Sequence, residues 1–206
     1  MLSQIGGHSR FIELANTTHV AGEGDTVCGS TLAQAFVAHP DAIDSLDATC
    51  AHTVPAIHTV GLYPHRISTQ PPLKPSTRSA TPRSALQLAA AAVATAGDAI
   101  ARNQATAISL DRGLFGGTVH ASDDGTILTL RRDQLIPGVA VSGQVTLSTA
   151  ANPLDGHIAT ATLTASASGL PPASFKATWP TTGPNAHAVL RGTVGDRRIS
   201  GTMPAP

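Results

Sequence analysis

The sequence predicts an α/β segment that is followed by an alanine-rich helix and then by an antiparallel β sandwich or barrel. Four patterns along the chain indicate this order. Residues 1–67 combine a short apolar stretch with one short amphipathic helix, and residues 68–84 are rich in Pro, Ser and Thr. Apolar side chains recur at three- and four-residue steps over residues 85–112, whereas residues 113–206 alternate with a period of two. The first spacing is that of a helix and the second that of half-buried strands.

The first segment predicts one strand and one helix. Residues 11–16 alternate roughly and run into a polar turn, which is typical of a short strand that ends in a loop. Residues 29–38 place Leu32, Phe36 and Val37 on one side of a helix, with a proline just beyond its end. We therefore expect α/β structure over this part of the chain.

A linker and a long helix are predicted next. The composition of residues 68–84 favours a partly extended linker. Thr81 is placed to be the N-cap of the following helix and Pro82 to be its first residue, ahead of the alanine-rich segment over residues 85–112. Gly97 lies in the interior of this helix, where glycine costs about 1 kcal/mol relative to alanine. We expect a packing reason for its presence.

The last segment predicts an antiparallel β domain. Asp124 and Gly125 lie in a turn between two alternating runs, and Gly195 and Asp196 form a second two-residue turn. Short strands separated by turn residues at regular spacing are typical of a sandwich or barrel. The predicted strands are residues 118–121, 127–130, 139–147, 157–165, 174–179, 188–194 and 198–203.

The charge balance argues against nucleic acid as a partner. The chain has 206 residues, 13% of them charged, and its 13 Lys and Arg side chains equal its 13 Asp and Glu side chains. Nucleic-acid binding depends on many Lys and Arg contacts that release counterions. No apolar run reaches the length of about 18 residues that a membrane span needs, so we expect none. No signal peptide is visible at the N-terminus, which indicates either a cytoplasmic chain or a missing preceding segment.

The two cysteines, Cys28 and Cys50, favour a disulfide. Gly, Thr and Asp residues lie close to them in the sequence, which fits a cross-link in an oxidising compartment better than the alternative of two free buried thiols. Closing a loop of this size contributes about 3 kcal/mol in the chain-entropy account of disulfides.

The other histidines and the glycines predict no cofactor site. His52, His58 and His65 do not have the spacing of a zinc-binding pair. The glycine-rich stretch at residues 113–117 precedes a predicted strand and favours a turn or bulge over a phosphate-binding loop. We expect no metal and no other cofactor.

His19 is the candidate catalytic residue. It follows the predicted strand in a polar turn, where an imidazole can reach a neighbouring hydroxyl and act as a general base near neutral pH. The plainer alternative is an ordinary surface histidine, which is the commoner role of a lone histidine in a loop.

The first segment resembles the C-terminal region of the tripeptidyl-aminopeptidase-like α/β-hydrolases. The resemblance covers about residues 8–67 and is carried by residues 10–20, by the helix that contains Phe36 and Val37, and by the segment around Cys50. It implies that the first segment is the C-terminal fragment of an α/β-hydrolase and that His19 is the histidine of its catalytic triad. It also implies that Cys28 pairs with Cys50 and that the chain is extracytoplasmic or secreted.

The rest of the triad is missing from the sequence. No Gly-x-Ser-x-Gly motif occurs, and the aspartates of the first segment follow His19, in the wrong chain order for this fold. The resemblance therefore implies the C-terminal portion of an exported serine hydrolase that is inactive alone. A peptide or ester would be its substrate only in the intact enzyme.

The alternative is a non-catalytic, extracytoplasmic binding or interaction module. Residues 113–206 would then bind a surface, a polymer or a neighbouring subunit through an exposed sheet. Trp179 and Tyr63 are too few to form the aromatic platform of a typical sugar-binding protein.

Overall fold

The computed structural model describes residues 9–15, 28–53, 63–76, 81–149, 156–183 and 185–206. The chain divides into two compact units. The first comprises residues 1–58 with 150–156 and 182–184, and the second comprises the remainder. Each unit is described below by itself.

The first unit is a small helical structure around a disulfide. It contains α1 (Cys28–Ala38), the 3-10 helix η2 (Pro40–Ser45) and α2 (Cys50–Thr53). Cys28, Leu32 and Ala51 form its buried core. The predicted disulfide is present: Cys28 is bonded to Cys50, and their Cα atoms are 5.8 Å apart. With so few buried apolar side chains, this cross-link is the main constraint on the fold of the unit.

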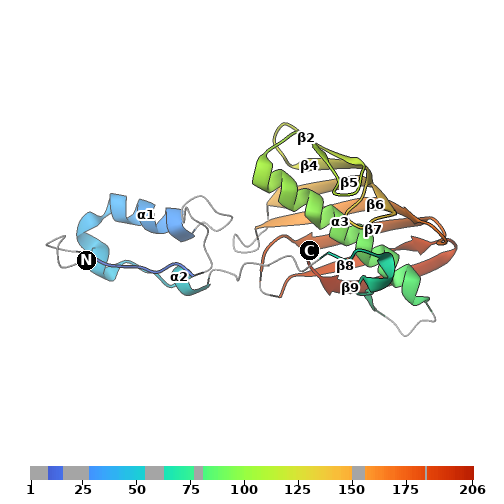
Figure 1. Cartoon of the computed structure of the whole chain (residues 1–206). Coiled ribbons are helices and arrows are strands. Elements are labelled where there is room, and N and C mark those ends of the chain that lie inside the picture. Colours follow the sequence, from blue (N-terminus) through green and yellow to red (C-terminus); the bar gives the residue numbers. More distant parts are fainter. Residues whose placement is uncertain (1–8, 16–27, 54–62, 77–80, 150–155, 184) are drawn as a thin grey trace. The chain divides into compact units, whose positions relative to one another are not determined.

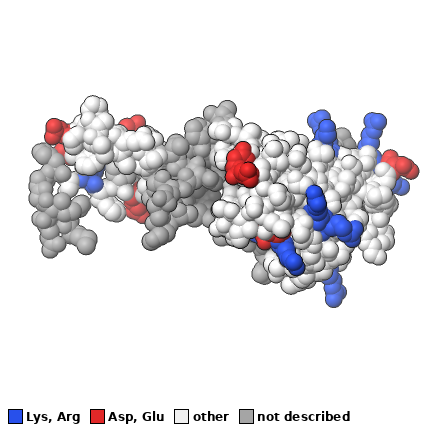
Figure 2. Space-filling model, turned by 90° about the horizontal axis from the view of Figure 1, so that it is seen from above, with Lys and Arg blue, Asp and Glu red and all other residues white. Residues whose placement is uncertain are grey.

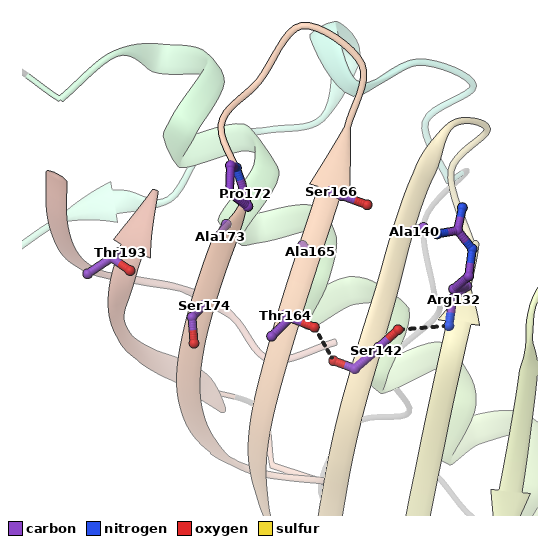
Figure 3. A pocket seen from close by; sticks show the side chains of 10 residues that line it. All are labelled: Arg132, Ala140, Ser142, Thr164, Ala165, Ser166, Pro172, Ala173, Ser174 and Thr193. Carbon is purple, nitrogen blue, oxygen red and sulfur yellow. Dashed lines mark hydrogen bonds between the residues drawn. The ribbon is translucent and has the colours of Figure 1, made fainter. Parts of the chain in front are cut away.

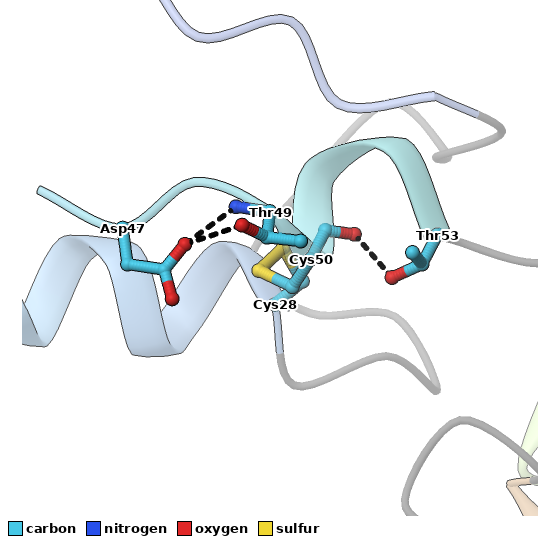
Figure 4. Close-up of a disulfide and its surroundings, with 5 residues drawn as sticks. All are labelled: Cys28, Asp47, Thr49, Cys50 and Thr53. Carbon is cyan, nitrogen blue, oxygen red and sulfur yellow. Dashed lines mark hydrogen bonds between the residues drawn. A yellow bond between two sulfur atoms is a disulfide. The ribbon is translucent and has the colours of Figure 1, made fainter.

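The start of α2 is fixed beside the disulfide by a carboxylate (Figure 4). Asp47 Oδ1 accepts hydrogen bonds from the backbone nitrogen of Thr49 at 2.9 Å and from its hydroxyl at 2.6 Å. These bonds hold the pKa of Asp47 below its usual value. The resulting turn leads directly into Cys50 and so places its sulfur against that of Cys28.

The predicted fragment of an α/β-hydrolase is wrong. Residues 11–15 are not part of a strand, and Ala15 N donates a hydrogen bond to Ala51 O at 3.2 Å. A strand of a parallel sheet needs a ladder of partners for its backbone, and no parallel pairing occurs in the part of the chain that the structure describes. The predicted helix is present, but Phe36 and Val37 are 44% and 77% exposed and only Leu32 is buried.

The second unit is one antiparallel sheet packed against one helix (Figure 1). Nine strands lie in the order β1-β9-β8-β7-β6-β5-β4-β3-β2, so that almost every strand pairs with its neighbour in sequence. They are β1 (Lys74–Pro75), β2 (Leu110–Arg112), β3 (Thr118–Ala121), β4 (Ile127–Asp133), β5 (Val139–Thr149), β6 (His157–Ala167), β7 (Ala173–Pro180), β8 (His187–Val194) and β9 (Arg197–Pro204).

The predicted sandwich or barrel is therefore also wrong, although each predicted strand overlaps a strand of the structure. The sheet does not close, because β1 and β2 each pair with one strand only. Nor does a second sheet cover it in the part of the chain that the structure describes, because the buried apolar side chains of the strands lie on one face. In β6, for example, Ala159, Ala161 and Leu163 are buried, while the alternate threonines are exposed. A sandwich needs two apolar inner faces. Here the apolar face packs on a helix and the other stays open.

That helix is α3 (Arg83–Thr106), which lies along the apolar face (Figure 1). It begins after Pro82, which takes the N-cap position predicted for Thr81. Every residue from Ala85 to Val93 is buried. By length and composition α3 could cross a membrane, but 78% of its most apolar stretch is buried inside the unit, as expected of a core helix.

Residues that precede α3 cover its N-terminal half. Gln87 Nε2 donates to the carbonyl oxygens of Ser68 and Gln70, at 2.8 and 2.9 Å. Leu73 is buried, and its backbone nitrogen donates to Leu86 O at 3.3 Å. The stretch read from the sequence as a linker thus contains the 3-10 helix η3 (Ile67–Thr69) and strand β1.

Close packing explains the presence of Gly97 in the interior of α3, as the sequence predicts. A Cβ atom at this position would lie 2.4 Å from the Cβ and Cγ atoms of Pro206. The C-terminal residue of the chain therefore packs on α3 where the helix carries no side chain.

We expect Gly97→Ala to lower the free energy of unfolding by about 1–3 kcal/mol, because the added methyl group overlaps Pro206. In a chain that ends at Ala205 the same substitution should instead stabilise, by up to about 1 kcal/mol, through helix propensity. Urea unfolding of the four chains measures both effects. Stabilisation by Gly97→Ala in both backgrounds would show that Pro206 does not pack there.

Candidate functional site

The open face of the sheet is an ordered polar surface. We use this name for the side of β1–β9 that faces away from α3. Cross-strand pairing aligns its side chains in rows, with neighbouring strands about 4.8 Å apart. One row is Thr146, Thr160, Thr178, Val189 and Thr202. The next is Gln144, Thr162, Lys176, Arg191 and Ser200, and a third is Ser142, Thr164, Ser174, Thr193 and Arg198.

Positive charge is concentrated on this face. Every Lys and Arg of the chain except Arg10 lies after residue 58, and Figure 2 shows these side chains projecting from the part of the molecule that carries the sheet. Seven exposed cations belong to strand positions of the open face: Lys74, Arg112, Arg131, Arg132, Lys176, Arg191 and Arg198. None of them forms an ion pair with a described carboxylate.

Acidic side chains on the described strands take the opposite side. Asp111 and Asp133 point toward α3, where both bind Arg102. Asp123, Asp124 and Asp196 lie in hairpin turns. Protein surfaces usually intersperse charges of both signs. A face of one sign attracts ligands of the other, because its field is not cancelled locally.

Three shallow hollows cross the open face. The first, of about 530 Å³, lies over β4–β8 (Figure 3). It shares Ser174 and Thr193 with a second hollow of about 490 Å³ that contains Lys176 and Arg191. Arg132 joins the first to a third, of about 480 Å³, which contains Arg112 and Arg131. Because neighbouring hollows share residues, they form one track from β2 to β8.

A bulge in β4 brings two adjacent arginines to this track. Pairing with β5 shifts register between Leu130 and Asp133, and Arg132 has a positive φ of 53°. Its backbone nitrogen donates to Ser142 Oγ at 2.9 Å (Figure 3). The extra residue lets Asp133 return to the apolar face while both preceding arginines stay exposed.

On the apolar face, one arginine holds three carboxylates. Arg102 donates to Asp98 at 2.8 Å, to Asp133 at 3.1 Å and to Asp111. The side chain of Asp133 is fully buried. Burial raises its pKa to about 6; Arg102 opposes this rise, whereas the charge of Asp98 adds to it. The cluster ties the C-terminal half of α3 to β2 and β4.

The glycine-rich stretch before β3 is a turn, as predicted. Gly116 N donates to Gly113 O at 3.1 Å, and Gly116 and Gly117 both have positive φ. A Cβ at Gly113 would lie 2.0 Å from Asp133 Oδ1, so the turn encloses that carboxyl. Composition signalled the turn; its contact with Asp133 depends on long-range pairing that sequence reasoning missed.

The predicted site residues have different outcomes. His19 lies outside the described residues, and its catalytic role stays a prediction. Cys28 and Cys50 form the predicted disulfide. Within the described ranges, no three His, Cys, Asp or Glu side chains gather as a metal site would require. The open-face cations were missed because the zero net charge of the whole chain hid their segregation.

Comparison with protein-family models, with curated proteins and with solved structures finds no match to this chain. The fold and the site therefore define the molecule only as a single-sheet, one-helix unit with a basic open face, preceded by a disulfide-linked helical unit.

We expect Asp133→Asn to change how stability depends on pH. The raised pKa means that the folded chain binds the proton of Asp133 more tightly than the unfolded chain, so this residue's contribution is fully present at low pH and is lost as pH rises through about 6. Asparagine has no ionisable carboxyl group, so the variant does not lose stability in this way as pH rises. Relative to wild type, the variant should gain about 2 kcal/mol between about pH 4 and about pH 7.

Asp124→Asn is the matched control of opposite sign. Hydrogen bonds from Ser122 and Thr126 hold the pKa of Asp124 at about 2, below its ordinary value of 3.8. The ionised carboxylate of Asp124 therefore stabilises the wild type above about pH 4, and this stabilisation is lost as pH falls toward about 2. The control should therefore lose stability relative to wild type as pH increases. Parallel stability curves of wild type and Asp133→Asn, measured by denaturant unfolding, would contradict the buried placement of Asp133.

Proposed function

We propose that this chain is an extracytoplasmic, non-catalytic binding protein that holds its partner on the open face of the second unit. One observation carries the proposal: the hollows that cross this face are linked into a track lined by cations and hydroxyl groups. The solvent exposure of this face does not by itself indicate binding, because one face of an antiparallel sheet commonly faces water. The segregation of charge and the continuity of the track are the features that point to binding.

The lining of the track supports binding without catalysis. It contains no His, Cys, Asp or Glu side chain, and so none of the usual general bases or metal ligands. A Ser or Thr hydroxyl is a weak nucleophile unless a neighbouring base activates it. The serine-hydrolase function that the resemblance implies stays a prediction, because it depends on His19.

The disulfide supports the proposed extracytoplasmic location. Cross-links of this kind persist in oxidising compartments and are rare in the cytosol. The pair Cys28–Cys50 therefore favours a chain that works outside the cytoplasm, where its partner would be found.

Blocking the open face with a bulky group tests this proposal. Both cysteines of the chain are in the disulfide, so Thr160→Cys introduces a single reactive thiol in the middle of the open face. After coupling to maleimide-polyethylene glycol, this variant should no longer cosediment with cell envelopes purified from the organism that produces the protein. The uncoupled variant should cosediment like the wild type.

Ala101→Cys is the matched control, because Ala101 is exposed on α3, away from the open face. Coupled to the same polymer it should retain binding. Equal retention by both coupled variants, or failure of the wild type to cosediment at all, would count against the proposal.

A further inference from the structure

The open face brings like charges together, directly opposite each other at Lys176 and Arg191 and two strand spacings apart at Arg112 and Arg131. Lys176 on β7 pairs with Arg191 on β8. Arg112 on β2 and Arg131 on β4 flank Thr118 on the intervening strand. Like charges across a strand pair destabilise a sheet. An anion bound between such side chains would remove the repulsion, so these pairs have the arrangement of a site whose ligand supplies the missing negative charge.

The cations are spread along the track and not gathered at one point. From Arg112 on β2 to Arg191 on β8 there are six strand spacings, or about 30 Å. Arg131 and Arg132 lie near one end of this track and Lys176 near the other. A single small anion could meet only one of these groups, whereas an extended polyanion could meet all of them.

Between the cations the track presents hydroxyl groups. Ser142, Thr164 and Ser174 line its middle part. A hydroxyl both donates and accepts hydrogen bonds, so rows of them match a ligand that carries hydroxyl groups of its own. Phe175 contributes to one hollow but is only 1% exposed. Among the described residues that line the three hollows, none is an exposed aromatic side chain on which a base could stack, as single-stranded nucleic acids commonly do on their binding proteins.

Resting on the proposed function, we infer that the partner held by the open face is an acidic polysaccharide, bound as an extended chain across the strands. Its carboxylate groups lie against the arginines and Lys176, and its sugar hydroxyls hydrogen-bond with the serine and threonine rows. Lipid surfaces fit less well, because they need an apolar insertion face. Of the exposed large apolar side chains on these strands, Val189 lines the second hollow, whereas Leu110 and Ile127 lie on β2 and β4, so the three stand on separate, non-adjacent strands and form no continuous apolar face.

Titration of the full chain with polygalacturonate tests this inference. Wild type should bind polygalacturonate, but not neutral dextran, and binding should weaken as salt is added because exposed charges are screened. The double variant Lys176→Gln/Arg191→Gln should bind about tenfold more weakly, as expected for the loss of two exposed ion pairs. Its Tm should rise, because the repulsion across β7 and β8 is gone.

Arg66→Gln/Arg83→Gln is the matched control, since it removes the same charge from exposed residues beside or within α3. It should bind like the wild type; an equal loss in both double variants would show attraction by net charge alone and overturn the inference. Tighter binding of poly(dT) or of phosphatidylglycerol vesicles would overturn it too. If polygalacturonate fails to bind while coupling at Thr160→Cys still abolishes envelope binding, the inference fails and the proposed function stands.

Discussion

The burial of α3 against a single face of the sheet is the constraint on which the rest of the second unit depends. The helix is built largely from alanine over its central part, and these residues are fully buried. Small side chains bury little apolar area each, at about 25 cal/mol per Å², so larger residues such as Trp179 and Phe175 on the sheet supply the remaining bulk. One helix covers the apolar side chains on one face of the sheet. The opposite face must then be polar if the unit is to stay open to water.

Charge follows the same division. Acids on the described strands turn toward α3, where Arg102 neutralises them in part, and every cation on these strands except Arg197 takes an open-face position. The arrangement costs stability on both sides: Asp133 is a buried carboxyl, and Lys176 faces Arg191. The cost of burying the Asp133 carboxyl is offset by its ion pair with Arg102, which ties α3 to the bulged strand β4. The repulsion between Lys176 and Arg191 is not neutralised by a carboxylate among the described residues, which is why this pair points to a ligand.

Local structure could be predicted from this sequence, but its assembly could not. Alternation located β3–β9, the i, i+4 spacing located α3, and the glycine penalty at Gly97 anticipated a packing contact. The same alternation fits a sandwich, a barrel or a single sheet, because it says which side of a strand is apolar and not what covers it. The hydrolase resemblance rested on short motifs in the first unit. There, residues 11–15 do not form a strand, and the buried core of the described residues lies around the disulfide.

Nuclear Overhauser contacts between methyl groups test the central packing most directly. The account predicts contacts from the alanine methyls of α3 to the buried Leu and Val methyls of β4, β5, β6 and β8, with none to the methyls of Thr160, Thr162 or Thr178 on the open face. Contacts between α3 and those threonines, or none between α3 and the buried methyls, would contradict it.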